Sequence, residues 1–233
     1  MRRQIQASIL SKYLLVLVLS IISFGQMSGL AAGPIARGNV GLRPIIQHFN
    51  EVEGNKEYFL ANPQDFEDGP VAEFFSLVDL DGVTEKLLGL DSLERLEDEN
   101  LQRFKLAIRE TFRRYLYEWL LSDLEMQLSV SPKSLKGVPK ETLTDEYELP
   151  VKLEIRGLPD VTLYFKARGK SEDLKISDVG FLFTSYASLK GHRLSNREPE
   201  KKLKKIIEVL KQKNDNFWSE KPLADSPNIL VSQ

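Results

Sequence analysis

The hydrophobic positions of this chain change from helical spacing in its first half to strand-like alternation in its second. The strongest pattern runs from Asp98 to Leu124, where apolar residues recur at steps of three and four. Its apolar stripe consists of Leu101, Phe104, Ile108, Phe112, Tyr115 and Trp119. Basic residues occupy the opposite face, and acidic residues at the start complement the helix dipole. The pattern predicts one long amphipathic helix.

Weaker helical spacing surrounds this segment. It predicts helices over residues 44–59, over 70–78 and from Asp81 to Leu88, with Asp81 as the N-cap and Gly89 as the end of the last one. The stretch 61–70, rich in Asn, Asp, Pro and Gly, is expected to be a loop. A closing helix is predicted to begin at Pro199, on the spacing of Leu203, Ile206, Ile207 and Leu210.

Alternation of apolar and polar residues indicates strands between these helices. Residues 126–130 alternate first, and residues 151–155 and 161–165 then form a hairpin pattern around the turn 157–160. A further strand follows from Leu174, and its alternation slips between Ile176 and Val179, which indicates a bulge. Helices followed by antiparallel strands and a last helix predict an α+β fold.

The N-terminal segment has the pattern of an export signal. Arg2, Arg3 and Lys12 precede an apolar run from Tyr13 to Phe24, which small residues follow. A cleaved secretory signal over residues 1–32 is favoured over an uncleaved anchor, since the apolar core is shorter than the ~20 residues of a membrane span. The expected organisation is then a flexible leader over 33–43, one domain over 44–213 and a polar tail over 214–233.

Composition narrows the classes of function. The chain has 233 residues, no cysteine and two histidines, which excludes disulfides, thiol nucleophiles and cysteine-ligated zinc. Its formal net charge of −2 argues against a general nucleic-acid binder. The fifteen acids and three bases of residues 51–99 contrast with the nine bases and three acids of residues 190–213. The basic stretch is either the solvated face of a helix or a docking surface for an acidic protein or an anionic membrane.

Candidate catalytic groups are few. Asp79 and Asp81 form a possible carboxylate pair, although capping a helix is the commoner use of such a residue. His48 and His192 have no partner at metal-ligand spacing, and Ser185 and Ser188 lack a nucleophile-elbow sequence. No enzymatic activity, metal or cofactor is therefore expected.

Three segments together resemble the MlaC family, also called the toluene-tolerance family, of exported lipid-binding proteins. The first is Val78-Asp79-Leu80-Asp81-Gly82-Val83 with Leu87-Leu88-Gly89, and the second is Leu101-Gln102-Arg103-Phe104 at the start of the long helix. The third is Leu174-Lys175-Ile176-Ser177-Asp178-Val179, which is similar to the family's W-K-V-Y-D-V strand. The sequence departs from the family where Leu182-Phe183 replaces the Glu-Gly that usually follows.

The resemblance implies helices packed on a curved antiparallel sheet that encloses an apolar pocket for acyl chains. It implies a periplasmic carrier that shuttles phospholipid between membrane-bound complexes, namely an ABC transporter with its substrate-binding subunit and an outer-membrane lipoprotein, and helps maintain outer-membrane lipid asymmetry. The residues expected to line or support the pocket are Phe74, Phe75, Val78, Leu87, Phe104, Ile108, Phe112, Tyr115, Trp119, Phe181 and Phe183. Periodicity alone does not decide between such a pocket and a filled core.

Two other classes of function remain open at this point. An exported adaptor with a closed core would bind envelope proteins through its acidic and basic faces. A divergent hydrolase is the weakest alternative, because neither its nucleophile nor its base can be named.

Overall fold

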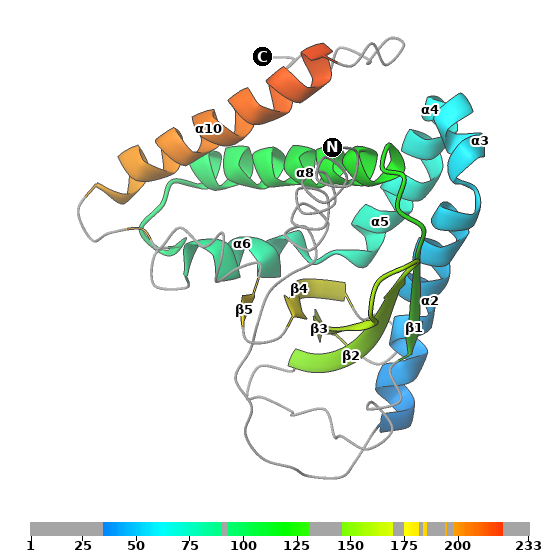
Figure 1. The fold of residues 1–233 in the computed structure, drawn as a ribbon. Helices are drawn as coiled ribbons and strands as arrows, with labels where there is room; N and C mark the ends of the chain where they lie inside the picture. The colour runs from blue at the N-terminus through cyan, green and yellow to red at the C-terminus, as the bar shows by residue number, and fades with distance from the viewer. Residues whose placement is uncertain are drawn as a thin grey trace.

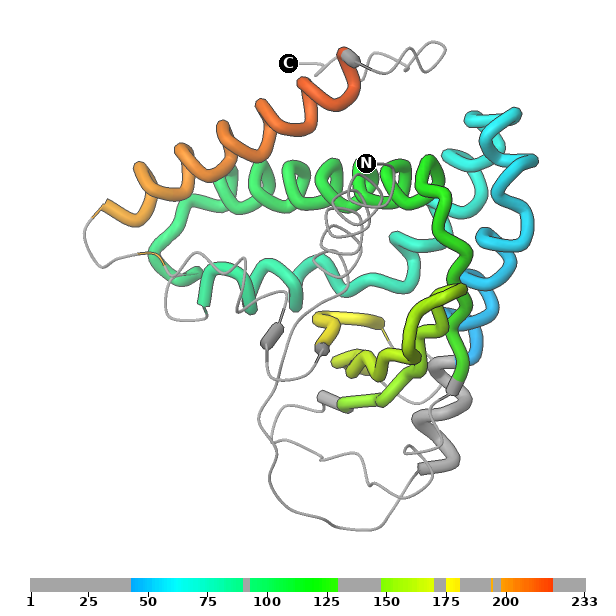
Figure 2. Tube along the Cα trace, in the orientation of Figure 1, coloured from blue at the N-terminus to red at the C-terminus, as the bar shows by residue number. Residues whose placement is uncertain are grey.

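The computed structural model describes residues 35–89, 93–130, 146–169, 175–181, 184–185, 194 and 198–220. In this part of the chain, helices pack against a curved antiparallel sheet, which confirms the α+β prediction (Figure 1). The long helix α8 (Asp98–Leu120) crosses above the sheet, and α10 (Pro199–Glu220) lies on the outer side of α8. The tube view shows α2 (Ile35–Gly54) descending beside the sheet, roughly across the direction of α8 (Figure 2).

The sheet has five strands in chain order, and each neighbouring pair is antiparallel. The strands are β1 (Met126–Val130), β2 (Glu146–Ile155), β3 (Val161–Arg168), β4 (Lys175–Phe181) and β5 (Thr184–Ser185). Strands β2 and β3 form the predicted hairpin, whose turn contains Gly157 with φ 82°. Glycine suits this position because it has no Cβ to oppose a positive φ.

The predicted irregularity in β4 is a bulge. Lys166 of β3 lies opposite Asp178, whereas the next residue, Ala167, lies opposite Ile176. Ser177 is therefore the extra residue, and both Ser177 and Asp178 are buried. A bulge bends its strand and redirects the side chains beside it.

The N-terminal helices differ from their expected boundaries. Helix α2 begins at Ile35 within the expected leader and continues through Pro44, and α3 (Lys56–Ala61) follows it. The loop expected over residues 61–70 is wrong, because α4 (Pro63–Phe66), a π-helix (Glu67–Val71) and α5 (Ala72–Leu77) occupy this region. Proline fits the first turn of α4, and helical winding buries Phe66 and Val71, an arrangement that the turn-rich composition conceals.

Helix α6 (Leu80–Leu88) is capped by Asp79, so the prediction of Asp81 as the N-cap is wrong. The Asp79 carboxylate accepts a hydrogen bond from the Gly82 N–H at 2.9 Å, and the Asp79 N–H donates to the Ile176 carbonyl at 2.8 Å. Asp81 lies in the first turn instead and pairs with Lys105 at 2.6 Å. The link to β4 selects between two acids that the sequence presents as equivalent.

Helix α10 continues to Glu220, past the boundary expected at residue 213. Its final turns bury Asn214, whose amide donates to the Ala107 carbonyl at 3.3 Å, and pack Trp218 against Tyr117 with ring centroids 5.0 Å apart. Residues 214–220, expected to begin a polar tail, are therefore part of the helix, where tertiary contacts hold them. The signal predicted over 1–32 lies outside the described residues, and no helix within them is long and apolar enough to cross a membrane.

Two clusters of buried residues form the core. The first, here the α6–α8–α10 core, is centred on Leu87, Leu88, Phe104, Ile108 and Leu203. The second, here the sheet core, joins α2, α4 and the end of α8 to the sheet through residues such as Val52, Phe66, Leu120, Val151 and Leu163. Helix α8 contributes to both clusters, which fixes its place above the sheet.

A candidate lipid-binding hollow

An apolar hollow lies between these two cores. Its walls come from four helices, α2, α5, α6 and α8, and from strands β1, β3 and β4. The residues that line it are Ile45, His48, Phe49, Phe74, Leu77, Val78, Val83, Phe112, Tyr115, Leu116, Trp119, Leu128, Phe165, Ile176, Ser177, Asp178 and Val179. Apart from the Tyr115 hydroxyl and the Trp119 indole nitrogen, the polar side-chain atoms come from His48, Ser177 and Asp178.

The hollow has the size of a ligand site. Its atom-free volume is about 1070 Å³ when the open mouth is included. The centres of water molecules can occupy about 140 Å³ of it, whereas a cavity that holds one water needs about 10–15 Å³ by the same definition. The hollow therefore exceeds the small voids of an ordinary close-packed interior.

One wall is the second half of α8. Phe112, Tyr115, Leu116 and Trp119 project from it at helical spacing into the hollow. Burial raises the pKa of the Tyr115 phenol, so this side chain stays neutral at physiological pH. The wall is thus uncharged along its length.

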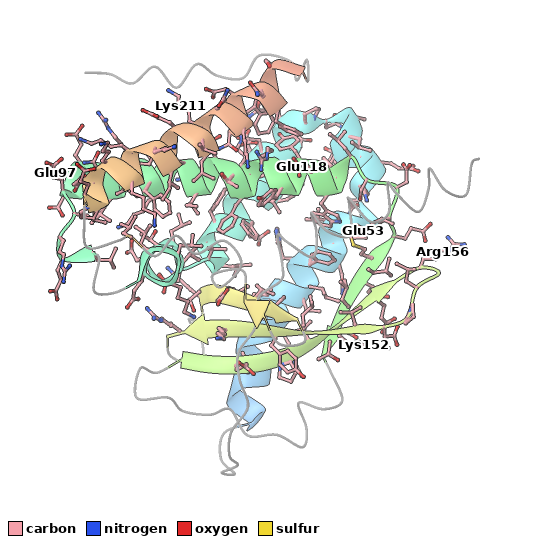
Figure 3. The ribbon with its side chains drawn as sticks, turned by 60° about the vertical axis from the view of Figure 1, so that its left-hand side comes forward. Glu53, Glu97, Glu118, Lys152, Arg156 and Lys211 are labelled. Atoms are coloured by element: carbon pink, nitrogen blue, oxygen red, sulfur yellow. The ribbon has the colours of Figure 1, made fainter. Side chains whose placement is uncertain are left out.

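The facing wall on α2 is held by its polar residues. The Phe49 ring stacks on Trp119, with centroids 4.6 Å apart and an angle of 11° between the rings. Glu53 lies on α2 (Figure 3). Its carboxylate accepts hydrogen bonds from the Trp119 indole N–H and the Met126 backbone N–H, both at 3.0 Å. One carboxylate thereby fixes α8 and β1 relative to α2, and it satisfies the indole donor that burial would otherwise leave unpaired.

Asn50 of α2 holds the edge of the sheet in a similar way. Its amide donates to the Leu128 carbonyl and its side-chain oxygen accepts from the Leu128 N–H, both at 2.8 Å. These are the backbone groups of β1 that a further strand would pair with. The amide therefore places α2 against the edge strand and holds Leu128 at the hollow.

The bulged part of β4 supplies the polar corner. The Lys86 ammonium donates to the Ser177 hydroxyl at 2.9 Å, and that hydroxyl lies 3.3 Å from the Lys166 carbonyl. The Asp178 carboxylate accepts from the Val179 N–H at 3.0 Å. These polar groups are bonded within the protein, and the corner ties α6 to the sheet.

His48 and Glu73 form a second polar contact beside the hollow. The His48 Nδ1 lies 2.8 Å from the Glu73 carboxylate, which links α2 to α5. The Phe74 ring, next in sequence to Glu73, meets Phe112 edge to face with centroids 6.3 Å apart. The short helix α5 is thereby attached to both long walls.

The sequence-predicted site residues divide into three groups. Five of them line the hollow, namely Phe74, Val78, Phe112, Tyr115 and Trp119. Leu87, Phe104 and Ile108 instead lie in the α6–α8–α10 core, while Phe75 packs against Phe74 and lies under the Arg109 guanidinium at 4.8 Å. The Phe181 side chain and all of Phe183 fall outside the described part of the chain.

The sequence interpretation did not include the α2 wall and most of the sheet floor. Ile45 and Phe49 carry a helical spacing, but nothing in that spacing says that they line a hollow opposite α8. Leu128, Phe165 and Ile176 show only the alternation of strands. Their convergence depends on contacts between distant segments.

Groups considered for catalysis have structural partners where they are described. Asp79 caps α6, Asp81 pairs with Lys105 and His48 pairs with Glu73. The residues that the structure describes contain no group of three or more His, Asp or Glu suited to a metal ion. The Ser185 side chain, Ser188 and His192 lie outside the described part, so the expectation of a non-enzymatic protein stays a prediction.

Comparison with known proteins supports the fold. No protein-family model and no curated protein matches the chain. Among solved structures it is similar to a phospholipid-binding protein from Ralstonia solanacearum, determined in complex with a phospholipid. The TM-score is 0.51 at 10% sequence identity, and the similarity covers 80% of this chain and 99% of the other. At this identity the likeness shows a shared fold.

Proposed function

We propose that this protein is a lipid carrier that holds the acyl chains of a phospholipid in the hollow between α2, α8 and β4. The observation that carries the proposal is the hollow itself, whose lining is aromatic and aliphatic on three sides. Removing an acyl chain from water yields about 0.8 kcal/mol per CH₂, so such a lining suffices for binding without a covalent or metal group. The fold shared with a phospholipid-binding protein supports the same class of ligand.

The wider role follows from the sequence. The signal-like segment 1–32 supports export to the periplasm with cleavage of that segment. The three segments similar to the MlaC family support shuttling of phospholipid between membrane-bound transport complexes, with an ABC transporter and an outer-membrane lipoprotein as partners. Maintenance of outer-membrane lipid asymmetry is the corresponding physiological role.

The alternative of an adaptor with a closed core has less support. A closed core would leave no ligand-sized space beside the aromatic residues of α8, whereas Phe112, Tyr115 and Trp119 border the hollow. In a lipid carrier, acyl chains would occupy this space and contact the same residues.

The direct test is solvent extraction of natively purified protein, followed by mass spectrometry of the extract. A carrier yields phospholipid in a fixed ratio to protein, above the amount extracted from an unrelated protein purified in parallel. Protein that yields no phospholipid, and that takes none from vesicles, contradicts the proposal.

A matched pair of substitutions connects bound lipid to the hollow. Val179→Trp places an indole at the β4 floor, where Val179 lines the hollow. Val161→Trp makes the same change at a half-buried valine of β3 that is not among the lining residues. We expect bound phospholipid to fall at least about fivefold in Val179→Trp and to stay near wild type in Val161→Trp, since only the first indole occupies space needed by the acyl chains. Equal lipid content in the two folded variants would place the lipid elsewhere.

A further inference from the structure

The outer helix α10 has one face that packs against the protein and one face that is exposed to solvent. Leu203 is fully buried, and Ile206, Ile207 and Leu210 pack beside it in the α6–α8–α10 core. Asn214 adds buried hydrogen bonds to Ala107 and Thr111 of α8. These contacts fix the rotation of the helix, so the opposite side of α10 faces away from the body of the protein.

That opposite side carries charge of mainly one sign. Residues 201–213 contain six lysines and one acidic residue, Glu208, and all six lysines are exposed. We refer to Lys201, Lys202, Lys204, Lys205, Lys211 and Lys213 as the lysine face. Figure 3 shows Lys211 on the side of α10 away from α8. At 1.5 Å per residue the face extends about 18 Å along the helix.

An ordinary solvated helix surface alternates its charges and pairs them. The exposed side of α8 does so, with Arg103 and Glu99 paired at 2.7 Å. On α10, Lys201 pairs with Glu198 at 3.1 Å, but Lys204, Lys205 and Lys211 form no ion pair with any residue that the structure describes. At least three of the six lysines of this face therefore have no acidic partner among the described residues.

The composition of the face favours a membrane over a protein as its partner. Protein interfaces are enriched in aromatic residues and arginine at their centres and depleted in lysine. Residues 201–213 contain neither arginine nor an aromatic residue, and Val209 is the large apolar side chain exposed there, at 42%. Hydrated, flexible lysines instead suit a layer of phosphate groups, which they approach without a fixed geometry.

We propose that the lysine face docks the protein on a membrane that contains anionic phospholipid. No residue of α10 lines the hollow, so docking and the holding of acyl chains use separate surfaces. Docking would bring the carrier to the membrane that gives or receives its lipid, without occupying the hollow. The inference stands apart from the proposed function, and the two fail in different measurements.

The test is flotation of the purified protein with vesicles. One set contains phosphatidylcholine alone, and the other contains about a third of phosphatidylglycerol. We expect binding to the anionic vesicles only, weakening as salt rises from about 50 to 200 mM because the attraction is screened. The variant Lys204→Glu, Lys205→Glu, Lys211→Glu should bind at least about tenfold less.

The matched control reverses three exposed basic residues elsewhere, Arg43→Glu, Arg156→Glu and Lys175→Glu. It changes the net charge by the same amount and should retain binding within about twofold. The variant Lys204→Gln, Lys205→Gln, Lys211→Gln should fall between wild type and the Glu variant, and it guards against misfolding. Phospholipid co-purified with the Glu variant should stay at the wild-type amount.

Several results would overturn the docking proposal. One is wild-type protein that does not float with anionic vesicles, and another is a Glu variant that floats as well as wild type. An equal loss of vesicle binding in the control variant would indicate that net charge alone is responsible. A lysine-dependent complex with an acidic protein, without vesicle binding, would also overturn it. Loss of co-purified lipid from wild type, with vesicle binding intact, would count against the hollow and not against the lysine face.

Discussion

The two halves of α8 carry one continuous apolar stripe but meet different surroundings. In the first half, Phe104 and Ile108 are almost fully buried between α6 and α10. In the second half, Phe112 and Trp119 face a hollow whose other walls are α2 and β4. The same periodicity thus builds a filled core at one end and a ligand-sized space at the other.

The difference lies in what approaches α8. Near Phe104, α6 and α10 lie directly on the helix, and Leu87 and Leu203 fill the space between them. Beyond Phe112, the floor is a curved sheet, and α2 stands against its edge through Asn50 and Glu53. In this half, the aromatic residues of α8 border the space between the helix, the sheet and α2. Burial of an apolar side chain is therefore weak support for a binding role by itself.

The largest expected effect comes from truncating one phenylalanine in each half. Phe104→Ala should lower the free energy of unfolding by about 3–5 kcal/mol, because it opens a cavity in a filled core. Phe112→Ala should cost less, since its ring already borders unfilled space. Urea unfolding of both variants measures the difference, with lipid removed so that ligand binding does not add to stability.

The outcome decides whether the two halves differ in packing. Equal losses for Phe104→Ala and Phe112→Ala would mean that the second half is as tightly packed as the first. Ile108→Ala serves as a second probe of the filled half and should resemble Phe104→Ala, at about 2–5 kcal/mol.

An intermediate effect is expected where α6 approaches β4. A Cβ on Gly82 would clash with the Asp79 carboxylate oxygen and lie 3.0 Å from the Ser177 Cβ. Gly82→Ala should therefore destabilise by about 1–3 kcal/mol, since it displaces the cap and the polar corner of the hollow together. Thermal unfolding measures the change.

Gly54→Ala is the matched control for this contact. A Cβ at Gly54, the last residue of α2, meets nothing within 4 Å. Alanine there should be neutral or stabilise by up to about 1 kcal/mol. If Gly82→Ala behaved like Gly54→Ala, close packing of α6 on the bulge would not limit the shape of the hollow.

The smallest effect concerns the outer side of the second half of α8. The Tyr117 hydroxyl donates to Glu67 at 3.0 Å, and Glu67 also pairs with Arg113 at 2.6 Å. Tyr117→Phe should cost about 1 kcal/mol at neutral pH through loss of this hydrogen bond. Denaturant unfolding at pH 7 checks the value.

The same hydroxyl should also make the stability of the protein depend on pH in the alkaline range. Burial, and then the neighbouring Glu67 carboxylate, raise the pKa of Tyr117. Below pH ~10 the phenol is protonated in both states, whereas above it the unfolded chain loses the proton first, so stability falls as pH rises. Wild-type protein should lose more stability above pH ~10 than Tyr117→Phe does. The control is Tyr58→Phe, at an exposed tyrosine bonded to Asp65. It should change the loss of stability with pH less, because solvent screens that contact. If wild type and Tyr117→Phe lost stability equally above pH ~10, Tyr117 would be excluded as the cause.

The sequence by itself determined most of the local structure. Spacings of three and four residues specified α8, and alternation specified the β2–β3 hairpin. The slip in the alternation between Ile176 and Val179 indicated a bulge, and the register of the strands places it at Ser177. These features follow from side-chain periods of 3.6 and 2, which are local properties of the chain. The charge pattern of residues 190–213 allowed either a solvated helix face or a docking surface.

Only the tertiary structure decided which apolar residues border the hollow. Phe104 and Phe112 belong to the same apolar stripe and to the same buried cluster, yet only Phe112 also borders the hollow. Asp79, and not Asp81, caps α6, and its backbone N–H bonds to β4. Helix α10 extends to Trp218, whose ring packs against Tyr117. Each outcome depends on a partner far away in the sequence. Periodicity says which side of an element is apolar, whereas packing between elements says what that side meets.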